Sequence, residues 1–212
     1  MQPYVHAQAS ALRSGRNWED DLPIHEFMDL AKVACPDLRH RLVLHNADLG
    51  PMLAAMAFSA RKDASDIALA HVKQDLGWLP PLEVWLDLCD PARLPPLRRN
   101  SSGGEEIVNS ASAYLGLEDE DTVKQVWDLL TLPEQFAPRH SALASALFMS
   151  SFGPVLARAV FGPPRAVDCG GGLTKILDFS WIAEGMIVAH IGTIYSLERV
   201  LGCFNGGEPV KA

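Results

Sequence analysis

The chain has 212 residues, of which 48% are hydrophobic and 21% are charged. This length suits one large domain or two small ones, and the composition excludes intrinsic disorder, collagen-like repeats and a small disulfide-stapled fold. The net charge of −8, from 26 acidic and 18 basic residues, repels a phosphate backbone. We therefore expect no binding to a nucleic-acid backbone and none to a membrane.

The four cysteines lie far apart, at Cys35, Cys89, Cys169 and Cys203, and no two form a Cys-x-x-Cys pair. This spacing excludes a zinc knuckle and a thioredoxin-type redox motif. The first residues lack the basic start and the continuous apolar core of a signal peptide. The longest uncharged run, 141–157, is too short and too polar to cross a bilayer. These features together predict a cytoplasmic protein.

Helical periodicity dominates the N-terminal part of the chain. Apolar residues recur three and four positions apart in Ile24–Ala34 and again in Arg41–Phe58, whereas clean alternation of β-branched residues is almost absent. This period is typical of amphipathic helices. We predict helices over both stretches.

A polar segment from Asp90 to Glu106, DPARLPPLRRNSSGGEE, has no hydrophobic period and is predicted to lack regular structure. It divides the chain into a His/Asp-rich helical domain over 1–92, a Pro/Gly/Ser connector over 93–105 and a small-residue-rich helical domain over 106–212. Each part is large enough for a small helical core, and the two can also pack as one unit.

Beyond the connector, Asp121 or Thr122 is a suitable N-cap for a helix that should end near Pro133. The longest helices are expected within 141–161 and 181–201, where the apolar runs are longest.

The only strand-like segments are short and lie around Arg165–Val167 and Ile176–Phe179. The fold class is therefore all-α, or nearly so, with the architecture of a helical bundle.

A weak internal repeat is also present. GPMLAAMAF at Gly50–Phe58 resembles GPVLARAVF at Gly153–Phe161, and each follows an Arg-His pair. If the repeat is genuine, it predicts a bundle of pseudo-repeated helical units. The alternative is that helices rich in small residues resemble one another by composition. Ser141–Ala157 and Gly185–Leu197 are rich in such residues, and we expect at least one to contribute to a homo-oligomer interface.

The histidines are concentrated in the first part of the chain. Five of the seven fall within the first 71 residues: His6, His25, His40, His45 and His71. His25 with Asp29, and His71 with Asp75, are four residues apart, which places each pair on one face of a helix. His45 and Asp48, three apart, also share a face. His40 and His45 diverge by about 140° on a straight helix, so one helix cannot direct both to the same ion.

These residue types predict a divalent metal site. The candidate ligands are His25, Asp29, His40, His45, His71 and Asp75. Nitrogen and oxygen donors suit zinc, manganese or iron, and an open coordination position would activate water. The hypothesis is a metal-dependent hydrolase of a phosphorylated or nucleotide substrate. The alternative is a non-catalytic accessory protein that acts through self-association or contact with another protein, its His/Asp pairs only supporting their helices.

The N-terminal part resembles a family of small uncharacterised proteins from bacteria and their phages. The matching motifs are LPIHEFMD at Leu22–Asp29, PDLRHRLVLHN at Pro36–Asn46, AHVKQDLGWLP at Ala70–Pro80 and VWL at Val84–Leu86. They cover about the first 90 residues. The resemblance implies a shared fold and supplies no activity, because the family has no established function.

Three departures from the family pattern concern the candidate site. This chain has Asn46 after His45, where the family often has paired histidines, and Ala34 at the position of another family histidine. The segment Ser59–Leu69 is also shorter. If the histidines bind metal, the resemblance implies that this chain has lost one ligand.

Overall fold

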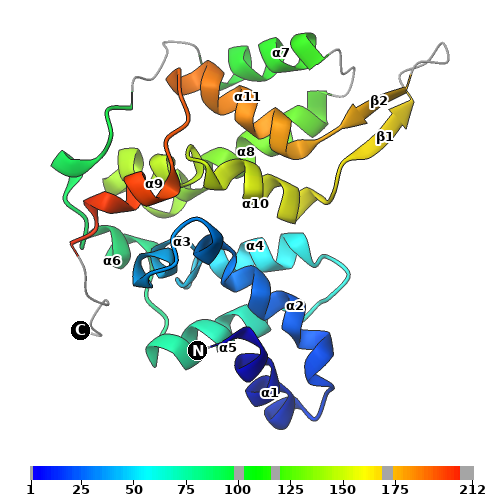
Figure 1. The fold of residues 1–212 in the computed structure, drawn as a ribbon, viewed down its shortest axis with the longest axis vertical. Helices are drawn as coiled ribbons and strands as arrows, with labels where there is room; N and C mark the ends of the chain where they lie inside the picture. Colours follow the sequence, from blue (N-terminus) through cyan, green and yellow to red (C-terminus); the bar gives the residue numbers. More distant parts are fainter. Residues whose placement is uncertain (1, 98–102, 116–119, 169–173, 206–212) are drawn as a thin grey trace.

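The chain is nearly all helical in the computed structural model, which describes residues 2–97, 103–115, 120–168 and 174–205 (Figure 1). The first group of elements is α1 (Pro3–Ser14), α2 (Trp18–Met28), the 3-10 turns η1 (Leu30–Val33) and η2 (Leu38–His40), α3 (Arg41–Leu44), α4 (Leu49–Ala57), α5 (Ala64–Leu76), α6 (Leu82–Leu86) and η3 (Pro91–Arg93). The second group is α7 (Gly104–Leu115), α8 (Glu120–Phe136), η4 (Pro138–His140), α9 (Ser141–Phe148), α10 (Phe152–Phe161), β1 (Arg165–Asp168), β2 (Thr174–Leu177), α11 (Phe179–Ile191), α12 (Leu197–Val200) and η5 (Leu201–Cys203).

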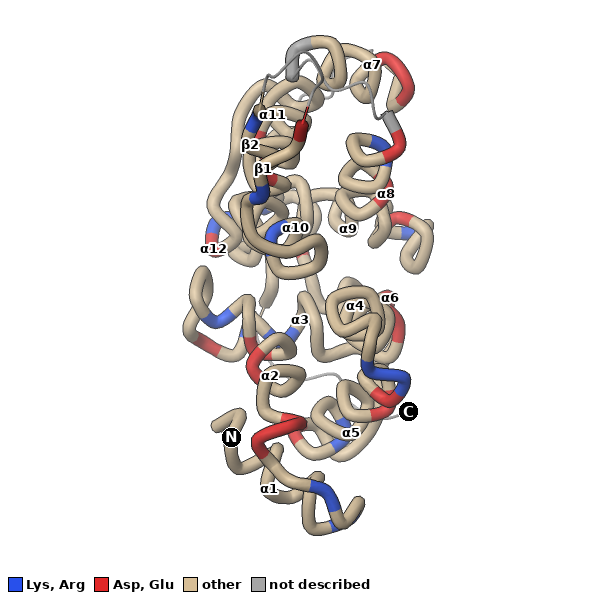
Figure 2. The backbone as a smooth tube through the Cα atoms, turned by 90° about the vertical axis from the view of Figure 1, so that its right-hand side faces the viewer, with Lys and Arg blue, Asp and Glu red and all other residues tan. Residues whose placement is uncertain are grey.

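The two groups of elements lie one above the other along the long axis (Figures 1 and 2). The helices α4 and α10 pack against each other where the groups meet. These are the two similar segments of the sequence repeat. One continuous apolar core joins both groups, and Trp85, Phe148 and Phe152 are its largest fully buried side chains. The burial of this whole apolar core provides most of the driving force for folding.

The expectation of an all-α or nearly all-α fold is confirmed. The only sheet among the described residues is a two-stranded antiparallel hairpin in which Arg165 pairs with Leu177 and Asp168 pairs with Thr174. It lies close to the two places where the sequence predicted short strands. Within the described part of the chain, no helix is long and apolar enough to cross a membrane.

The expected helix over Arg41–Phe58 is divided in two, and the side chain of Asn46 explains the break. Its Nδ2 donates to the carbonyl oxygen of Val43 (3.2 Å), and its Oδ1 accepts from the N–H of Leu49 (2.7 Å). One side chain therefore provides hydrogen-bond partners for a carbonyl at the end of α3 and for the first N–H of α4. In a straight helix these backbone groups would bond to each other's turns and would need no side chain.

The prediction that 141–161 and 181–201 hold the longest helices was wrong. The first stretch is divided into α9 and α10, and the second ends α11 at Gly192, which has a φ of +76°. The longest described helix is α8, with 17 residues, which continues three residues beyond Pro133. Leu130 and Ala137, on either side of this proline, are fully buried. Packing therefore outweighs the local preference of proline to end the helix.

Part of the predicted connector has short regular structure. The turn η3 occupies the start of the Pro-rich segment, and α7 begins at Gly104, inside the predicted range 93–105. Residues 98–102 lie outside the described part of the chain. The small-residue helix α9 is covered by the same chain, and its residues from Leu143 to Phe148 are all buried.

Candidate metal centre

Three segments of the first group bring histidine and aspartate side chains together. Asp29 directly follows α2, His45 directly follows α3, and His71 and Asp75 lie one turn apart on α5. These four side chains are between 0% and 6% exposed. The i,i+4 spacing that the sequence showed on α5 does place both side chains on the inward face of that helix.

The donor atoms of these four residues lie close to one another around His45 Nε2 and His71 Nε2. His45 Nε2 lies 3.1 Å from His71 Nε2 and 3.2 Å from Asp75 Oδ2. Asp29 Oδ1 lies 3.7 Å from His45 Nε2 and 3.9 Å from His71 Nε2. An ion with bonds of about 2.0–2.2 Å holds its ligands about 3–4 Å from one another. The separations therefore match those of ligands that share one ion.

His40 reaches the same carboxylate from the other side, with its Nε2 3.6 Å from Asp29 Oδ1. The sequence argument that His40 and His45 diverge assumed a straight helix. The backbone instead passes from the 3-10 turn η2 into a single turn of α3, and both rings face Asp29. Their rings meet edge to face, with centroids 5.4 Å apart.

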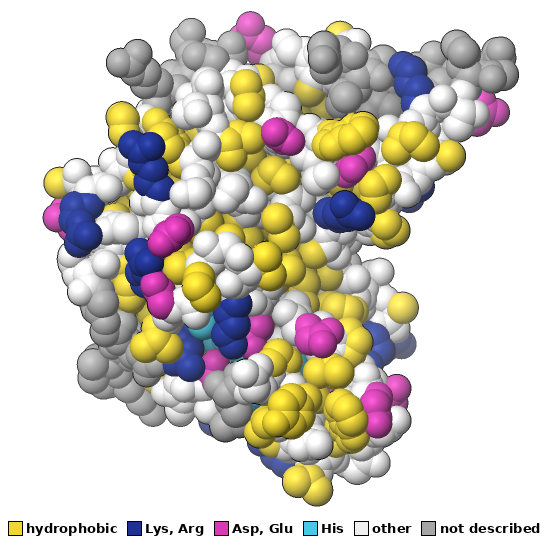
Figure 3. Space-filling model, in the orientation of Figure 1, with side chains coloured by type: hydrophobic (Ala, Val, Ile, Leu, Met, Phe, Trp, Pro, Cys, Tyr) yellow, Lys and Arg dark blue, Asp and Glu magenta, His cyan; other side chains and the backbone are white. Residues whose placement is uncertain are grey.

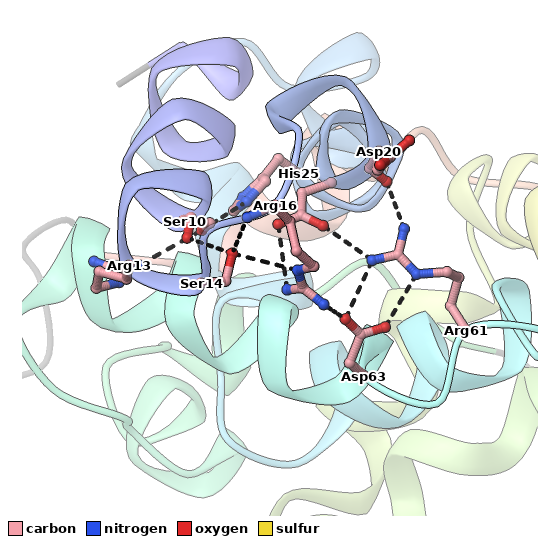
Figure 4. A network of polar contacts seen from close by, with 9 residues as sticks. Ser10, Arg13, Ser14, Arg16, Asp20, His25, Arg61 and Asp63 are labelled. Atoms are coloured by element: carbon pink, nitrogen blue, oxygen red, sulfur yellow. Dashed lines mark hydrogen bonds and ion pairs between the residues drawn. The ribbon is translucent and has the colours of Figure 1, made fainter.

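His25 does not join this group of donor atoms. Its Nδ1 lies 2.9 Å from Nδ1 of His71, on the side of that ring turned away from His45. Its Nε2 lies 3.2 Å from Oγ of Ser10 on α1 (Figure 4). When His71 Nε2 faces an ion, its Nδ1–H can donate to His25, whose Nε2–H donates to Ser10. Such outer contacts orient the ligating ring.

The sequence analysis missed His6 as a site residue. Its Nε2 lies 3.1 Å from Asp75 Oδ1, and its Nδ1 lies 2.6 Å from the side-chain amide of Gln74. The clustering of histidines near the N-terminus was the available signal, but the lone residue on α1 had no carboxylate partner at helical spacing. The described donors form two groups of three whose ligand atoms lie within 4.8 Å of one another: His6, His71 and Asp75, and Asp29, His40 and His45. The contacts of His45 with His71 and Asp75 join the two groups.

Two residues next to His45 have structural contacts instead of site contacts. Asp48, which the sequence paired with His45, accepts from the N–H of Leu82 (2.7 Å) and so caps α6. Asn46 bonds to backbone atoms of α3 and α4, so the departure from the paired histidines removes no donor from the group. Trp85 Nε1 donates to the carbonyl oxygen of His45 (2.8 Å) and fixes the backbone at this position.

Burial keeps His25, His45 and His71 neutral, each with a lone pair that can be donated. It lowers the pKa of His71 to about 2 and that of His25 to about 4, and it lowers the pKa of His45 as well. Burial opposes ionisation of the Asp29 and Asp75 carboxyls. Contacts with histidines, with Lys32 beside Asp29 and with Arg41 near Asp75, outweigh it and hold both pKa values below their usual range. Neutral imidazole and ionised carboxylate are the forms that bind metal.

Basic side chains border the group on its outer side. Lys32 Nζ lies 2.7 Å from Asp29 Oδ2, and Arg41 Nη2 lies 3.4 Å from Asp75 Oδ2. Figure 3 shows a histidine side chain at the bottom of a hollow between basic and acidic side chains. In a chain with a net charge of −8, these cations form a local positive rim.

A second polar network holds α1 and α2 against the start of α5 (Figure 4). Asp21, whose side chain is fully buried, pairs with Arg61 (2.9 Å) and with Arg16 (3.4 Å). Both arginines also pair with Asp63, which precedes α5. Because α1 carries His6, Asp29 directly follows α2 and α5 carries His71, this network fixes the frame of the candidate site.

Residues 1–94 match the model of a domain of unknown function, DUF6915. All the donors described above lie within this range. No curated protein and no solved structure matches the chain. The family model therefore accounts for the first group of elements and assigns no chemistry to it.

Proposed function

We propose that this protein binds one divalent transition metal ion between Asp29, His45, His71 and Asp75, with His40 beside it, and uses it to hydrolyse a phosphorylated or nucleotide substrate. The observation that carries the proposal is the convergence of four buried donor atoms from three separate segments, because five of their six separations, all except that between the two carboxylates, are 3.1–3.9 Å. Buried charges and imidazoles rarely gather in this way without an ion or a compensating network.

The donor set supports zinc, manganese or iron, because it contains imidazole and carboxylate and no thiolate. The charge supports one ion. Asp29 and Asp75 together contribute two negative charges, which balance one divalent cation. A second cation, held by His6, His71 and Asp75, would have to share two of these residues with the first.

Hydrolysis follows from what surrounds the ion. A divalent ion lowers the pKa of bound water to about 7, which supplies hydroxide at neutral pH. Lys32 and Arg41 lie on the outer side of the donor group and would neutralise the charge of a phosphate next to the ion. His40 Nε2 lies on the same side, next to Asp29 Oδ1, where it can accept a proton from the attacking water.

The metal content of the purified full chain tests the binding step. We expect one zinc, manganese or iron ion per chain. Asp29→Asn and His71→Gln should each weaken binding by about 100-fold or more, because each removes one ligand. His140→Gln is the matched control, since His140 lies in the turn η4 and contacts Asp87 at 2.8 Å, away from the donors. Equal metal content in all four proteins would refute the site.

Phosphate release from nucleotides and from bis(4-nitrophenyl) phosphate tests the hydrolysis step. Turnover should require the metal, disappear in Asp29→Asn and persist in His140→Gln. A chain that holds one ion per molecule and releases no phosphate from any of these substrates would retain the metal site and refute the hydrolase.

The donors are at most 6% exposed, and this observation favours a second candidate function. A closed site is typical of structural metals. In that case the protein is a non-catalytic accessory protein, stabilised by its ion, that acts by self-association or by contact with another protein. Metal-dependent folding without metal-dependent turnover would distinguish this function from hydrolysis.

A further inference from the structure

The helices α5 and α11 are alike in length, ends and buried positions. Each has 13 residues, begins after an aspartate N-cap and ends at a glycine with a φ of +76°, Gly77 or Gly192. The buried residues of α5 are Ala64, Ile67, Ala68, His71 and Val72, and those of α11 include Phe179, Ile182, Ala183, Met186 and Ile187. Taken in order, each of these five residues of α5 and its counterpart in α11 are the same number of residues apart as Gly77 and Gly192. Met186 therefore occupies the place of His71.

The helices α4 and α10 are alike in their close approach to the preceding helix. A Cβ atom on Gly50 would lie 2.1 Å from the last carbonyl oxygen of α3, and one on Gly153 would lie 2.1 Å from the last carbonyl oxygen of α9. The same two Cβ atoms would lie 2.8 Å from Met28 on α2 and 2.8 Å from Leu130 on α8. Each glycine thus makes room for the same pair of neighbours.

The breaks before α4 and α10 are closed in the same way. Asn46 accepts from the first N–H of α4 and donates to a carbonyl of α3, and Ser150 accepts from the first N–H of α10 (3.2 Å) and donates to a carbonyl of α9 (2.7 Å). The residue before Asn46 is His45, and the residue before Ser150 is Met149. Both residues are buried.

Contacts between the two groups of elements occur in pairs. Arg139 Nη2 lies 2.8 Å from Glu83 Oε2 of the first group, and Arg39 Nη2 lies 3.9 Å from Glu198 Oε1 of the second. Each arginine precedes the histidine of a 3-10 turn, and each glutamate is the second residue of a short helix. In a two-fold interface, if residue i of one copy contacts residue j of the other, then residue j of the first copy also contacts residue i of the second. The two Arg–Glu contacts follow this pattern.

The chain ends of the two groups repeat this exchange through the backbone. The N–H of Asp90 donates to the carbonyl oxygen of Cys203 (2.7 Å), and the N–H of Asn205 donates to the carbonyl oxygen of Leu88 (3.2 Å). Leu88 and Cys203, and likewise Asp90 and Asn205, are as far apart in the sequence as Gly77 and Gly192. They are therefore equivalent residues of the two groups.

We infer that the described residues of 104–205 are a second copy of the fold of residues 3–90, placed as the partner in a two-fold dimer, and that its positions equivalent to His6, His45 and His71 have become part of an apolar core. Met149 and Met186 replace His45 and His71, and both methionines are at most 1% exposed. On the 12-residue helices α1 and α7, the buried Ile107 takes the place of His6. Among the residues that the structure describes, the second copy has no group of three donors like those of the first, and we expect it to hold no ion.

The second copy therefore acts as a partner subunit within the same chain. Its α10 covers the face of α4 that a separate first copy would present to a dimer partner. Its Glu198 lies beside Arg39, the residue that precedes His40 in the chain. The helix α10, which begins within the small-residue stretch, packs against another part of the same chain, and an interface between separate chains stays a prediction.

Restoring the histidines to the second copy tests the inference. The full-length variant Met149→His/Met186→His would place two new imidazoles beside His190, which occupies the place of Asp75. Three nitrogens suffice for a zinc site. We expect zinc per chain, measured by elemental analysis after desalting, to rise by one over the parent, with helical content unchanged by circular dichroism. A folded variant with the zinc content of the parent overturns the inference.

A second measurement involves no metal and decides the inference if that variant fails to fold. Gly50→Ala and Gly153→Ala should lower the urea midpoint of the full chain by similar amounts, because both added methyl groups meet the same neighbours. Gly185→Ala, on α11, is the control, since nothing lies within 4 Å of its Cβ position, and its midpoint should not fall. A large loss in one of the first two variants and none in the other overturns the equivalence of the copies.

These measurements separate the inference from the proposed function. The gain in zinc rests on the proposed metal site, and a parent chain that holds no metal refutes that site by itself. The glycine pair then still tests the two-fold relation.

Discussion

The metal-free protein should lose stability as the pH falls from about 7.5 to about 5.5. His25, His45 and His71 are buried, and burial lowers their pKa values from an ordinary 6.5, to about 4 for His25 and about 2 for His71. Over this range they stay neutral in the folded chain and take up protons when it unfolds. Because the unfolded state binds more protons, acid favours it.

The magnitude follows from linkage. A histidine that titrates at 6.5 only in the unfolded chain contributes about 1.4 kcal/mol over these two pH units. Three such histidines give a fall of about 4 kcal/mol, a large share of the roughly 5–15 kcal/mol of a typical domain. Asp29 and Asp75 have lowered pKa values, so the stability that they provide is lost only below about pH 4. They do not contribute to the slope above that pH.

Urea unfolding in the presence of EDTA, followed by circular dichroism, measures this fall. The variant His71→Gln removes one of the three titrating groups and should reduce the fall by about one third. A profile that stays flat between these pH values, or a stability that rises in acid, would show that the three rings are not buried as neutral groups and would refute the reasoning.

Three further substitutions test the frame of the site. Ser10→Ala removes the hydroxyl at the end of the histidine contacts and should weaken metal affinity by about 10-fold without changing the stoichiometry, measured by zinc titration. Trp85→Phe removes the buried donor to a backbone carbonyl and should lower the free energy of unfolding by about 1–3 kcal/mol in urea; no change would mean that the carbonyl finds another donor. Arg61→Ala leaves the buried Asp21 paired only with Arg16 and should cost about 2 kcal/mol in the same assay; an unchanged free energy of unfolding would show that Arg16 alone is a sufficient partner.

Most residues of the candidate donor group could be named from the sequence, although His6 could not, and the arrangement of the group could not be predicted. The spacing of His71 and Asp75 indicated a shared face, and the structure places both side chains toward the other donors. The position of His40 relative to His45 could not be predicted from their spacing, because the backbone changes from the 3-10 turn η2 to the α-helix α3 between them and the number of residues per turn changes with it. No local pattern distinguishes a residue that faces the donor group from one behind it, and His25 therefore looked like a ligand.

The fold was predictable where the period was continuous and not where a single side chain interrupts it. The helical class followed from the apolar period, as the sequence indicated, whereas the end of α11 at Gly192 did not. The breaks at Asn46 and Ser150 depend on side-chain bonds to backbone that residue type alone does not reveal. The sequence showed the repeat only at α4 and α10, and not the two-fold relation between the two groups of elements. Equivalent residues of the two groups share burial and geometry, but they need not share chemistry, as His71 and Met186 illustrate.

The packing of α4 against α10 also has a consequence for synthesis. About 100 residues separate the end of α4 from the end of α10, and a ribosome needs roughly 5–20 s to add them. During this time the nascent chain exposes an apolar helix whose partner does not yet exist. The α10 of a neighbouring chain can cover it with the same contacts. Domain-swapped dimers are therefore an expected by-product where many nascent chains are close together, and faster chain elongation, which shortens the exposure of α4, should reduce them.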